Sequence, residues 1–167
     1  PLRSRRARLE GSLIVRSLPR RAGTRPRTTP TNPHSQLTQN PDRDLHARLA
    51  ARLFLLPGVE ERPSLVSVPG ARALWLRLAS GNGNPDAFMV GREFAHLHPL
   101  PDGSLHAALP AAVARQAVEA GWAEPHPLAG ALGRTGLVML YAPRTEAELE
   151  TVVALVSEAY RFASGSA

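Results

Sequence analysis

Two short apolar runs on either side of a turn constrain the fold of this chain more than any other feature. Residues 94–98 and 105–109 have the composition of β-strands, and the segment between them contains the turn sequence Pro101-Asp102-Gly103. We expect the two runs to pair as the arms of one antiparallel hairpin, joined by a loop of residues 99–103.

Histidine is concentrated in and just after this hairpin. The chain has six histidines, and four of them, His96, His98, His106 and His126, fall within 31 residues. A five-residue loop places His98 opposite Ser104 and His96 opposite His106. Because side chains alternate along a strand, His96, His98 and His106 share one face, whereas a slip of one residue would turn His106 to the far face.

The same alternation predicts on which face of the hairpin the neighbouring residues of the first arm lie. Phe94 belongs to the face of His96 and His98, where it can contribute to binding a substrate. Glu93 falls on the alternate set, so we expect its carboxylate to be solvated.

The remaining elements are predicted from hydrophobic periodicity and turn signals. We expect helices over residues 44–56, 110–120 and 145–162, and further strands over residues 64–68, 71–78, 87–90 and 136–142. This order predicts an α+β fold, with a mainly antiparallel sheet of about five to six strands and helices packed on it. We expect a single domain over residues 42–163, followed by a flexible C-terminus at residues 164–167.

The N-terminal quarter of the chain differs in composition from the rest. Residues 1–45 contain ten arginines and three acidic residues, whereas residues 46–167 contain ten arginines and eleven acidic residues. Few apolar side chains are available there to offset the entropy lost on ordering, so we expect residues 1–41 to form a disordered Arg/Pro-rich tail.

Composition also limits the cell location and the partners. The chain has no cysteine, which fits a cytoplasmic protein without disulfides or thiolate chemistry. No apolar run approaches the ~20 residues that cross a bilayer, so we expect no membrane anchor. No aromatic residue precedes Phe54, which disfavours base stacking by the tail and specific nucleic-acid binding.

The three hairpin histidines allow three interpretations. They can perform acid–base catalysis on a bound small molecule, because the pKa of imidazole lies close to neutral pH. His96, His98 and His106 can instead bind a divalent metal, since three histidines form a known catalytic zinc site. In the third interpretation they are structural, and hydrogen bonds to the backbone or to one another satisfy them.

From about residue 92 to residue 159, and less clearly back to Leu53, the chain resembles the fungal luciferase family. The resemblance is carried by residues 92–98, 104–109, 121–122, 126–130 and 140–144, together with Glu146 and Glu148. The loop between Gly130 and Thr135 is shorter than in the fungal members, and the arginine-rich tail replaces their apolar N-terminal segment.

The resemblance implies an oxygen-using enzyme. Fungal luciferases oxidise a hydroxylated styryl-pyrone with O2, without a known metal or organic cofactor. By resemblance, His96 or His106 is the general base, His98 and His126 orient the substrate by hydrogen bonds, and Trp122 and Tyr141 form pocket walls. The expectation covers oxidation of a small enolic or pyrone-like substrate, with O2 as co-substrate, and not the emission of light.

Two alternatives remain open from the sequence. The domain can be a non-catalytic module that binds a small ligand in the same pocket. It can also be a metal-dependent enzyme that uses His96, His98 and His106 as ligands. The sequence does not indicate an oligomeric state.

Overall fold

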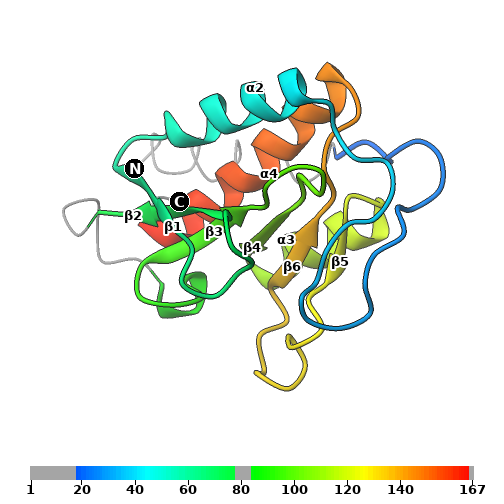
Figure 1. Cartoon of the computed structure of the whole chain (residues 1–167). Helices are drawn as coiled ribbons and strands as arrows, with labels where there is room; N and C mark the ends of the chain where they lie inside the picture. The colour runs from blue at the N-terminus through cyan, green and yellow to red at the C-terminus, as the bar shows by residue number, and fades with distance from the viewer. Residues whose placement is uncertain (1–17, 78–83, 166–167) are drawn as a thin grey trace, which may run out of the picture.

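The computed structural model describes residues 18–77 and 84–165, which form one six-stranded antiparallel sheet in the order β1-β2-β3-β4-β6-β5 (Figure 1). This α+β architecture with helices packed on an antiparallel sheet is the fold class predicted from the sequence. The strands are β1 (Val59–Pro63), β2 (Arg72–Leu76), β3 (Glu93–Leu97), β4 (Leu105–Ala108), β5 (Ala123–Pro125) and β6 (Leu137–Leu140).

The α-helices of the described residues pack mainly on one side of the sheet. They are α2 (Arg43–Phe54), α3 (Ala111–Glu119) and α4 (Glu146–Ser164), and a 3₁₀ turn, η2, spans Pro85–Ala87. Helix α4 contacts β3 and β4, α2 packs along α4, and α3 contacts β5 (Figure 1). None of these helices has the length and apolarity to cross a membrane.

The apolar stripes predicted from periodicity form the core. Leu49 and Leu53 of α2, and Val152 and Val156 of α4, are fully buried. They pack in one cluster with the alternate residues of the central strands, such as Leu97 of β3. The sheet therefore buries one face under helices, and the other face is left for the histidines.

The predicted histidine hairpin is confirmed in its register. His96 pairs with His106 across β3 and β4, and the His98 N–H donates to the Ser104 carbonyl at 2.9 Å. The loop of residues 99–103 closes with a hydrogen bond from the Gly103 N–H to the Pro99 carbonyl, and Gly103 has the positive φ of +68° that such a turn requires.

A β-bulge interrupts the pairing between β2 and β3. Leu74 pairs with Ala95, but the next residue, Trp75, pairs with Glu93. Phe94 is the extra residue at this point. A bulge breaks the strict alternation of side chains, so predictions that depend on alternation fail N-terminal to Ala95.

The bulge corrects two predictions. Phe94 is turned to the helix side, where its ring lies 6.2 Å from that of Tyr160 in α4, instead of sharing the histidine face. Glu93, which we expected in solvent, is fully buried and hydrogen-bonded to His96 at 2.8 Å.

The structure also corrects the prediction for the N-terminal segment. Residues 18–41, here called the N-terminal strap, were expected to be disordered but run beside β5 and β6 (Figure 1). The Arg21 N–H donates to the Ala120 carbonyl, and the Gln36 side-chain oxygen accepts from the buried Ala142 N–H. Polar contacts, rather than an apolar stripe, hold the strap, which is why its composition does not reveal it. Residues 1–17 lie outside the described residues.

Smaller differences concern the ends of elements. Residues 64–68 form a loop rather than a strand, because pairing with β2 ends where Pro63 faces Arg72. Residues 87–90 contain the end of η2 and one bridge from Val90 to Glu93 instead of a strand, and β5 was not predicted. Helix α4 runs to Ser164, where Gly165 caps it. The end of the predicted strand over residues 71–78 and the last two residues, 166–167, lie outside the described residues.

Candidate functional site

Five of the six histidines form one group of rings, here called the histidine cluster. His96 and His98 come from β3 and its end, His106 from β4, His34 from the strap, and His126 from the loop after β5. Neighbouring rings in the cluster have centroids between 4.6 and 5.5 Å apart. The structure thus brings together the four histidines singled out in the sequence and adds a fifth from a distant segment.

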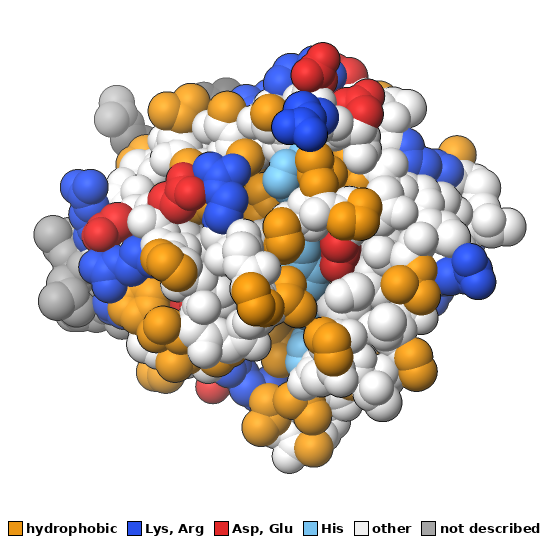
Figure 2. Space-filling view, viewed as in Figure 1, with side chains coloured by type: hydrophobic (Ala, Val, Ile, Leu, Met, Phe, Trp, Pro, Cys, Tyr) orange, Lys and Arg blue, Asp and Glu red, His pale blue; other side chains and the backbone are white. Residues whose placement is uncertain are grey.

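The cluster forms one side of a cavity of about 580 Å³. Figure 2 shows histidine atoms at the base of a groove that is flanked by hydrophobic side chains. The apolar part of the lining comes from the strap, the loop after β1, the segment after η2, and the loop and strand that follow β5: Pro33, Val66, Val68, Pro69, Met89, Leu128, Leu132 and Leu137. A largely apolar cavity of this size with a few polar groups is typical of small-molecule sites.

Three imidazoles of the cluster form a continuous chain of close polar contacts between two carboxylates. Glu93 Oε1 lies 2.8 Å from His96 Nδ1, and His96 Nε2 lies 3.0 Å from His106 Nδ1. His106 Nε2 lies 3.0 Å from His34 Nδ1, and His34 Nε2 lies 2.7 Å from Glu124 Oε1. Both nitrogens of each ring are therefore engaged.

Hydrogen bonds hold both terminal groups of this chain as carboxylates. Burial would raise the pKa of Glu93, but donors from His96, Ser64 and the Leu65 N–H outweigh it and lower that pKa. Burial would likewise raise the pKa of Glu124, but hydrogen bonds from His34, Thr28 and the Tyr141 hydroxyl outweigh burial and lower it. Both carboxylates accept a hydrogen bond from their histidine partner.

The two imidazoles in the middle of the sheet are neutral. Burial lowers the pKa of His96, although the hydrogen bond that its N–H donates to Glu93 acts in the opposite direction. Burial lowers the pKa of His106 well below its ordinary value, and neighbouring imidazoles add to the effect. Neutral rings can accept a proton or bind a metal, whereas imidazolium can do neither.

His98 is held by a separate carboxylate in the hairpin loop. Its Nδ1 lies 2.8 Å from Asp102 Oδ2, and Asp102 also accepts from the Ser104 N–H and hydroxyl. These hydrogen bonds lower the pKa of Asp102 although burial acts to raise it. His98 Nε2 is buried and has no hydrogen-bond partner among the described residues. The sixth histidine, His46, supports the same residue by donating from Nε2 to the His98 carbonyl at 3.0 Å.

His126 is the most accessible ring of the cluster. Its Nδ1 accepts the Leu128 N–H at 3.1 Å, so the ring proton of the neutral form is on Nε2. Burial and the nearby imidazoles, first of all that of His34, lower the pKa of His126 to about 4. At neutral pH this residue can donate a hydrogen bond from Nε2 to a bound molecule.

The three residues predicted to contribute to substrate binding, Phe94, Trp122 and Tyr141, are not among the residues that line the cavity. Phe94 packs under α4, as described above. The Trp122 indole N–H donates to the Pro19 carbonyl of the strap at 2.6 Å, and the Tyr141 hydroxyl donates to Glu124 at 2.8 Å. Tyr141 therefore supports the histidine chain through Glu124, and its pKa is raised by burial and by that carboxylate.

Sequence reasoning missed four polar residues of the site. His34 lies in a segment that its composition assigned to disorder, and Glu93 needs the bulge to reach the histidine face. Glu124 lies in β5, a three-residue strand too short for a periodic signal. Asp102 was identified only as a turn residue, yet its position four residues after His98 was a usable signal of their contact.

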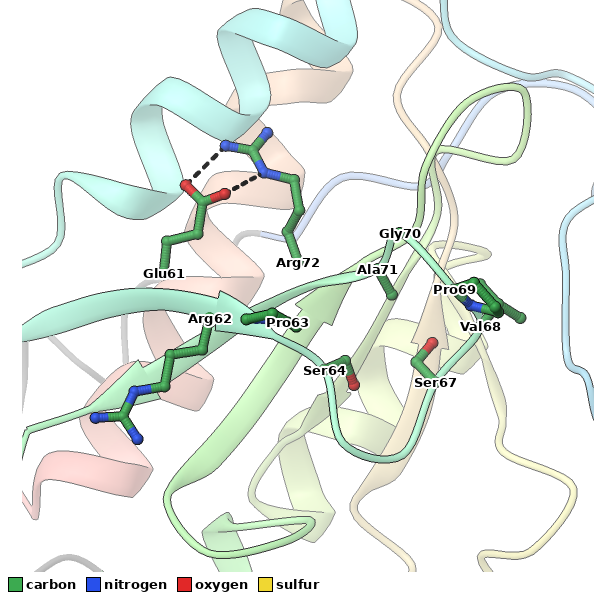
Figure 3. A pocket seen from close by; sticks show the side chains of 10 residues that line it. All are labelled: Glu61, Arg62, Pro63, Ser64, Ser67, Val68, Pro69, Gly70, Ala71 and Arg72. Carbon is green, nitrogen blue, oxygen red and sulfur yellow. Dashed lines mark hydrogen bonds and ion pairs between the residues drawn. The ribbon is translucent and has the colours of Figure 1, made fainter.

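A second pocket, of about 520 Å³, lies in the connection between β1 and β2 (Figure 3). Its charged pair, Glu61 and Arg72, is satisfied internally by two hydrogen bonds of 2.7 and 2.9 Å, drawn as dashed lines in Figure 3. Ser67, Val68 and Pro69 line this pocket and the histidine-lined cavity. The loop of residues 64–71 therefore separates the two, and the histidines belong to the cavity alone.

Known proteins are similar to this chain over the segment that contains most of the site residues. The luciferase-domain family matches residues 91–159. The luciferase of Armillaria gallica is 44% identical over 72 residues, which are 41% of this chain and 26% of that protein, and the luciferase of Armillaria mellea matches with the same figures. The luciferase of Neonothopanus nambi is 42% identical over 69 residues, which are 39% of this chain and 26% of that protein.

The match spans about a quarter of the length of these curated relatives, and no solved structure matches the chain. The matched segment runs from β3 to most of α4 and includes His96, His98, His106 and His126. His34 lies outside it. Over this matched segment, which is less than half of the chain, the protein is similar to the luciferase-domain family and to the fungal luciferases.

Proposed function

We propose that this protein is an oxidoreductase that uses O2 to oxidise a small, largely apolar molecule with an acidic enolic hydroxyl. The observation that carries the proposal is the apolar cavity with a histidine cluster at its base. The similarity to fungal luciferases supports an oxidative reaction, and the enolic or pyrone-like substrate is the one that the resemblance implies.

The polar lining of the cavity suits a molecule that becomes an anion during the reaction. The described residues that line it include no acidic side chain. Arg134 belongs to the lining, and the carbonyls of Asp86 and Phe88 hold its guanidinium at 2.8 and 2.6 Å. The N–H of neutral His126 is available as a further donor, and donors placed where charge develops stabilise an anion.

The chemistry requires a proton acceptor and O2. The enolic hydroxyl transfers its proton to the histidine cluster, which leaves an enolate. The enolate gives two electrons to O2, one at a time, and a carbon–oxygen bond forms. The outer oxygen of the resulting peroxide receives a proton, so the product is a keto hydroperoxide and no other oxidant is needed.

Oxygen uptake by the full chain tests this proposal across a panel of catechol, enol and pyrone compounds. The double variant His96→Ala, His106→Ala removes the centre of the cluster, and we expect it to lose oxygen uptake by roughly 10²–10⁴-fold. Circular dichroism confirms that the variant remains folded. Equal uptake by both proteins on every accepted substrate would contradict catalysis by the cluster.

A matched pair of surface variants tests whether an anion forms in this cavity during the reaction. Leu132 lines the cavity and is 56% exposed, whereas Leu55 is 79% exposed and lies at the end of α2. Leu132→Asp should lower kcat/KM about tenfold, which corresponds to a like-charge repulsion of the enolate of ~1.4 kcal/mol. Leu55→Asp should leave kcat/KM unchanged. Saturable ligand binding in the cavity without oxygen uptake would favour the alternative of a non-catalytic binding domain.

A further inference from the structure

We propose that His96, His98 and His106 bind one divalent transition-metal ion at the base of the cavity. All three side chains are buried, and their candidate ligand nitrogens lie within 4.8 Å of one another. The proposal goes beyond the oxidation proposed above, because it concerns the affinity of three named side chains for a metal and not the identity of a substrate.

The orientation of the three rings selects one nitrogen from each. His96 Nδ1 is bonded to Glu93, so Nε2 is left for a metal. His98 Nδ1 is bonded to Asp102, so Nε2 is left there as well. In His106, Nε2 is bonded to His34, and Nδ1 lies 3.0 Å from His96 Nε2. Two imidazole nitrogens on a tetrahedral ion lie about 3.3 Å apart, given bonds of about 2.0–2.1 Å, so His96 and His106 need little movement to share an ion.

The outer nitrogens have the partners that metal-binding histidines usually have. A ligating histidine generally donates its other N–H to a carboxylate, carbonyl or water, which fixes its tautomer and its orientation. Here Glu93 accepts from His96 and Asp102 from His98. His106 reaches its carboxylate through His34, whose Nε2 lies 2.7 Å from Glu124. Each of the three ligands therefore has its own carboxylate.

Counting protons shows why a metal suits this arrangement. A neutral imidazole carries one N–H, and in His96, His98, His106 and His34 that N–H can donate outward, toward Glu93, Asp102, His34 and Glu124 respectively. His96 Nε2 and His106 Nδ1 then face each other at 3.0 Å with a lone pair on each. A proton between them would satisfy these two atoms but not His98 Nε2, which is buried without a partner. One metal ion satisfies all three nitrogens.

A second group of three histidines, His34, His106 and His126, also has nitrogens within 4.8 Å of one another. Its geometry is less suitable, because His126 Nδ1 accepts the Leu128 N–H and its proton is therefore on Nε2. The two groups share His106, so a variant of His126 distinguishes them.

Three neutral imidazoles suit zinc, iron, copper or nickel rather than magnesium or calcium. A set of three histidines leaves a further coordination position for water or a substrate oxygen. Because all three histidines belong to the cavity lining, that position is on the side where a small molecule binds. The bound ion would act there as a Lewis acid on an enolic oxygen.

Cobalt(II) titration of the full chain, after dialysis against a chelator, tests the site without reference to activity. We expect saturation at one Co²⁺ per chain with visible absorption of a low-coordinate site, and competition by Zn²⁺. His98→Ala should weaken Co²⁺ binding by at least about 100-fold, and His126→Ala by no more than a few fold. Asp102→Asn should weaken binding by about 10–100-fold, because an amide N–H on His98 Nδ1 moves the ring proton to Nε2.

The outcomes separate cleanly. If the wild-type protein shows no saturable binding, or if His126→Ala abolishes binding and His98→Ala does not, the proposal is overturned. If His98→Ala fails to fold by circular dichroism, Asp102→Asn decides, because Asp102 lies in the hairpin loop. Co²⁺ binding without oxygen uptake on any substrate supports the metal site and contradicts the proposed oxidation. Oxygen uptake by a protein that binds no metal would support the proposed oxidation and contradict the metal site.

Discussion

Gly136, which directly precedes β6, allows a close approach of two backbone segments that the sequence does not predict. The Leu109 N–H donates to the Gly136 carbonyl at 2.9 Å, and a Cβ added at Gly136 would collide with the carbonyl oxygen of Leu109. The backbone of these two residues is fixed by β4 and β6, so it cannot move apart easily. Glycine is required here by close approach of the backbone rather than by a positive φ.

We therefore expect Gly136→Ala to destabilise the protein by about 1–3 kcal/mol, the usual cost of overpacking. Gly130→Ala is the matched control, because a Cβ at Gly130 meets no atom within 4 Å, and its effect should stay within about 0.5 kcal/mol. Urea unfolding at neutral pH measures both. Equal stability of the two variants would show that the backbone at Gly136 can move.

At the same scale, individual residues show where prediction from sequence succeeded. The turn and the alternation of apolar residues placed His96 and His106 opposite each other, as the structure confirms. The prediction failed for Glu93 and Phe94, because the bulge at Phe94 depends on how β3 pairs with Trp75 of β2 and has no signal of its own in the sequence of β3. Local patterns fix a register only where the pleat is regular.

The beginning of α4 shows how an element depends on a few charged contacts. Thr145 caps the helix by accepting the Glu148 N–H, and the Glu148 carboxylate accepts from the N–H and guanidinium of Arg144. The side chain of Glu148 is only 10% exposed, and a guanidinium nitrogen of Arg21 in the strap lies 3.8 Å from its carboxylate. These contacts tie the helix start to the strap.

The pKa of Glu148 gives a prediction for the dependence of stability on pH. Burial raises this pKa, but the hydrogen bonds from Arg144 and the charge of Arg21 outweigh burial and lower it from the model-peptide value of 4.5. A lowered folded-state pKa contributes stability above the unfolded value, and this contribution is lost as the pH falls through the folded value. Glu148→Gln should therefore cost about 1–2 kcal/mol at pH 7, and the difference from wild type should shrink below about pH 4.5.

Urea unfolding of both proteins between pH 3 and pH 7 measures this difference. Glu146→Gln serves as the control, because Glu146 and its partner Arg48 have exposed side chains and such pairs contribute about 0–1 kcal/mol. A Glu148→Gln effect that persists unchanged at low pH would assign it to packing instead of charge.

For the whole molecule, the N-terminal strap is as much a part of the fold as the sheet. It supplies a carbonyl to the Trp122 indole, an acceptor to the buried Ala142 N–H and the imidazole of His34 to the cluster. Each buried donor left without its acceptor costs about 1–3 kcal/mol. The luciferase-domain match at residues 91–159 does not include these residues, so the matched segment alone lacks part of its own support.

Deletion of residues 1–41 should consequently lower the thermal midpoint by roughly 6–20 °C, given a loss of several kcal/mol in a chain of this size. Differential scanning calorimetry of the full chain and of the deletion variant measures the shift. An unchanged thermal midpoint would show that this segment is a disordered tail, as its composition predicts.

The sequence by itself determined the fold class, the helices with long apolar stripes and the histidine hairpin, because periodicity and turn chemistry act over a few residues. It also identified four of the five histidines of the cluster. Only the tertiary structure decided that His34 and Glu124 complete the chain of imidazoles, because they come from segments 90 residues apart and meet through packing. The same holds for Glu93 and for the walls of the cavity, whose positions follow from a bulge and from loops that no local pattern specifies.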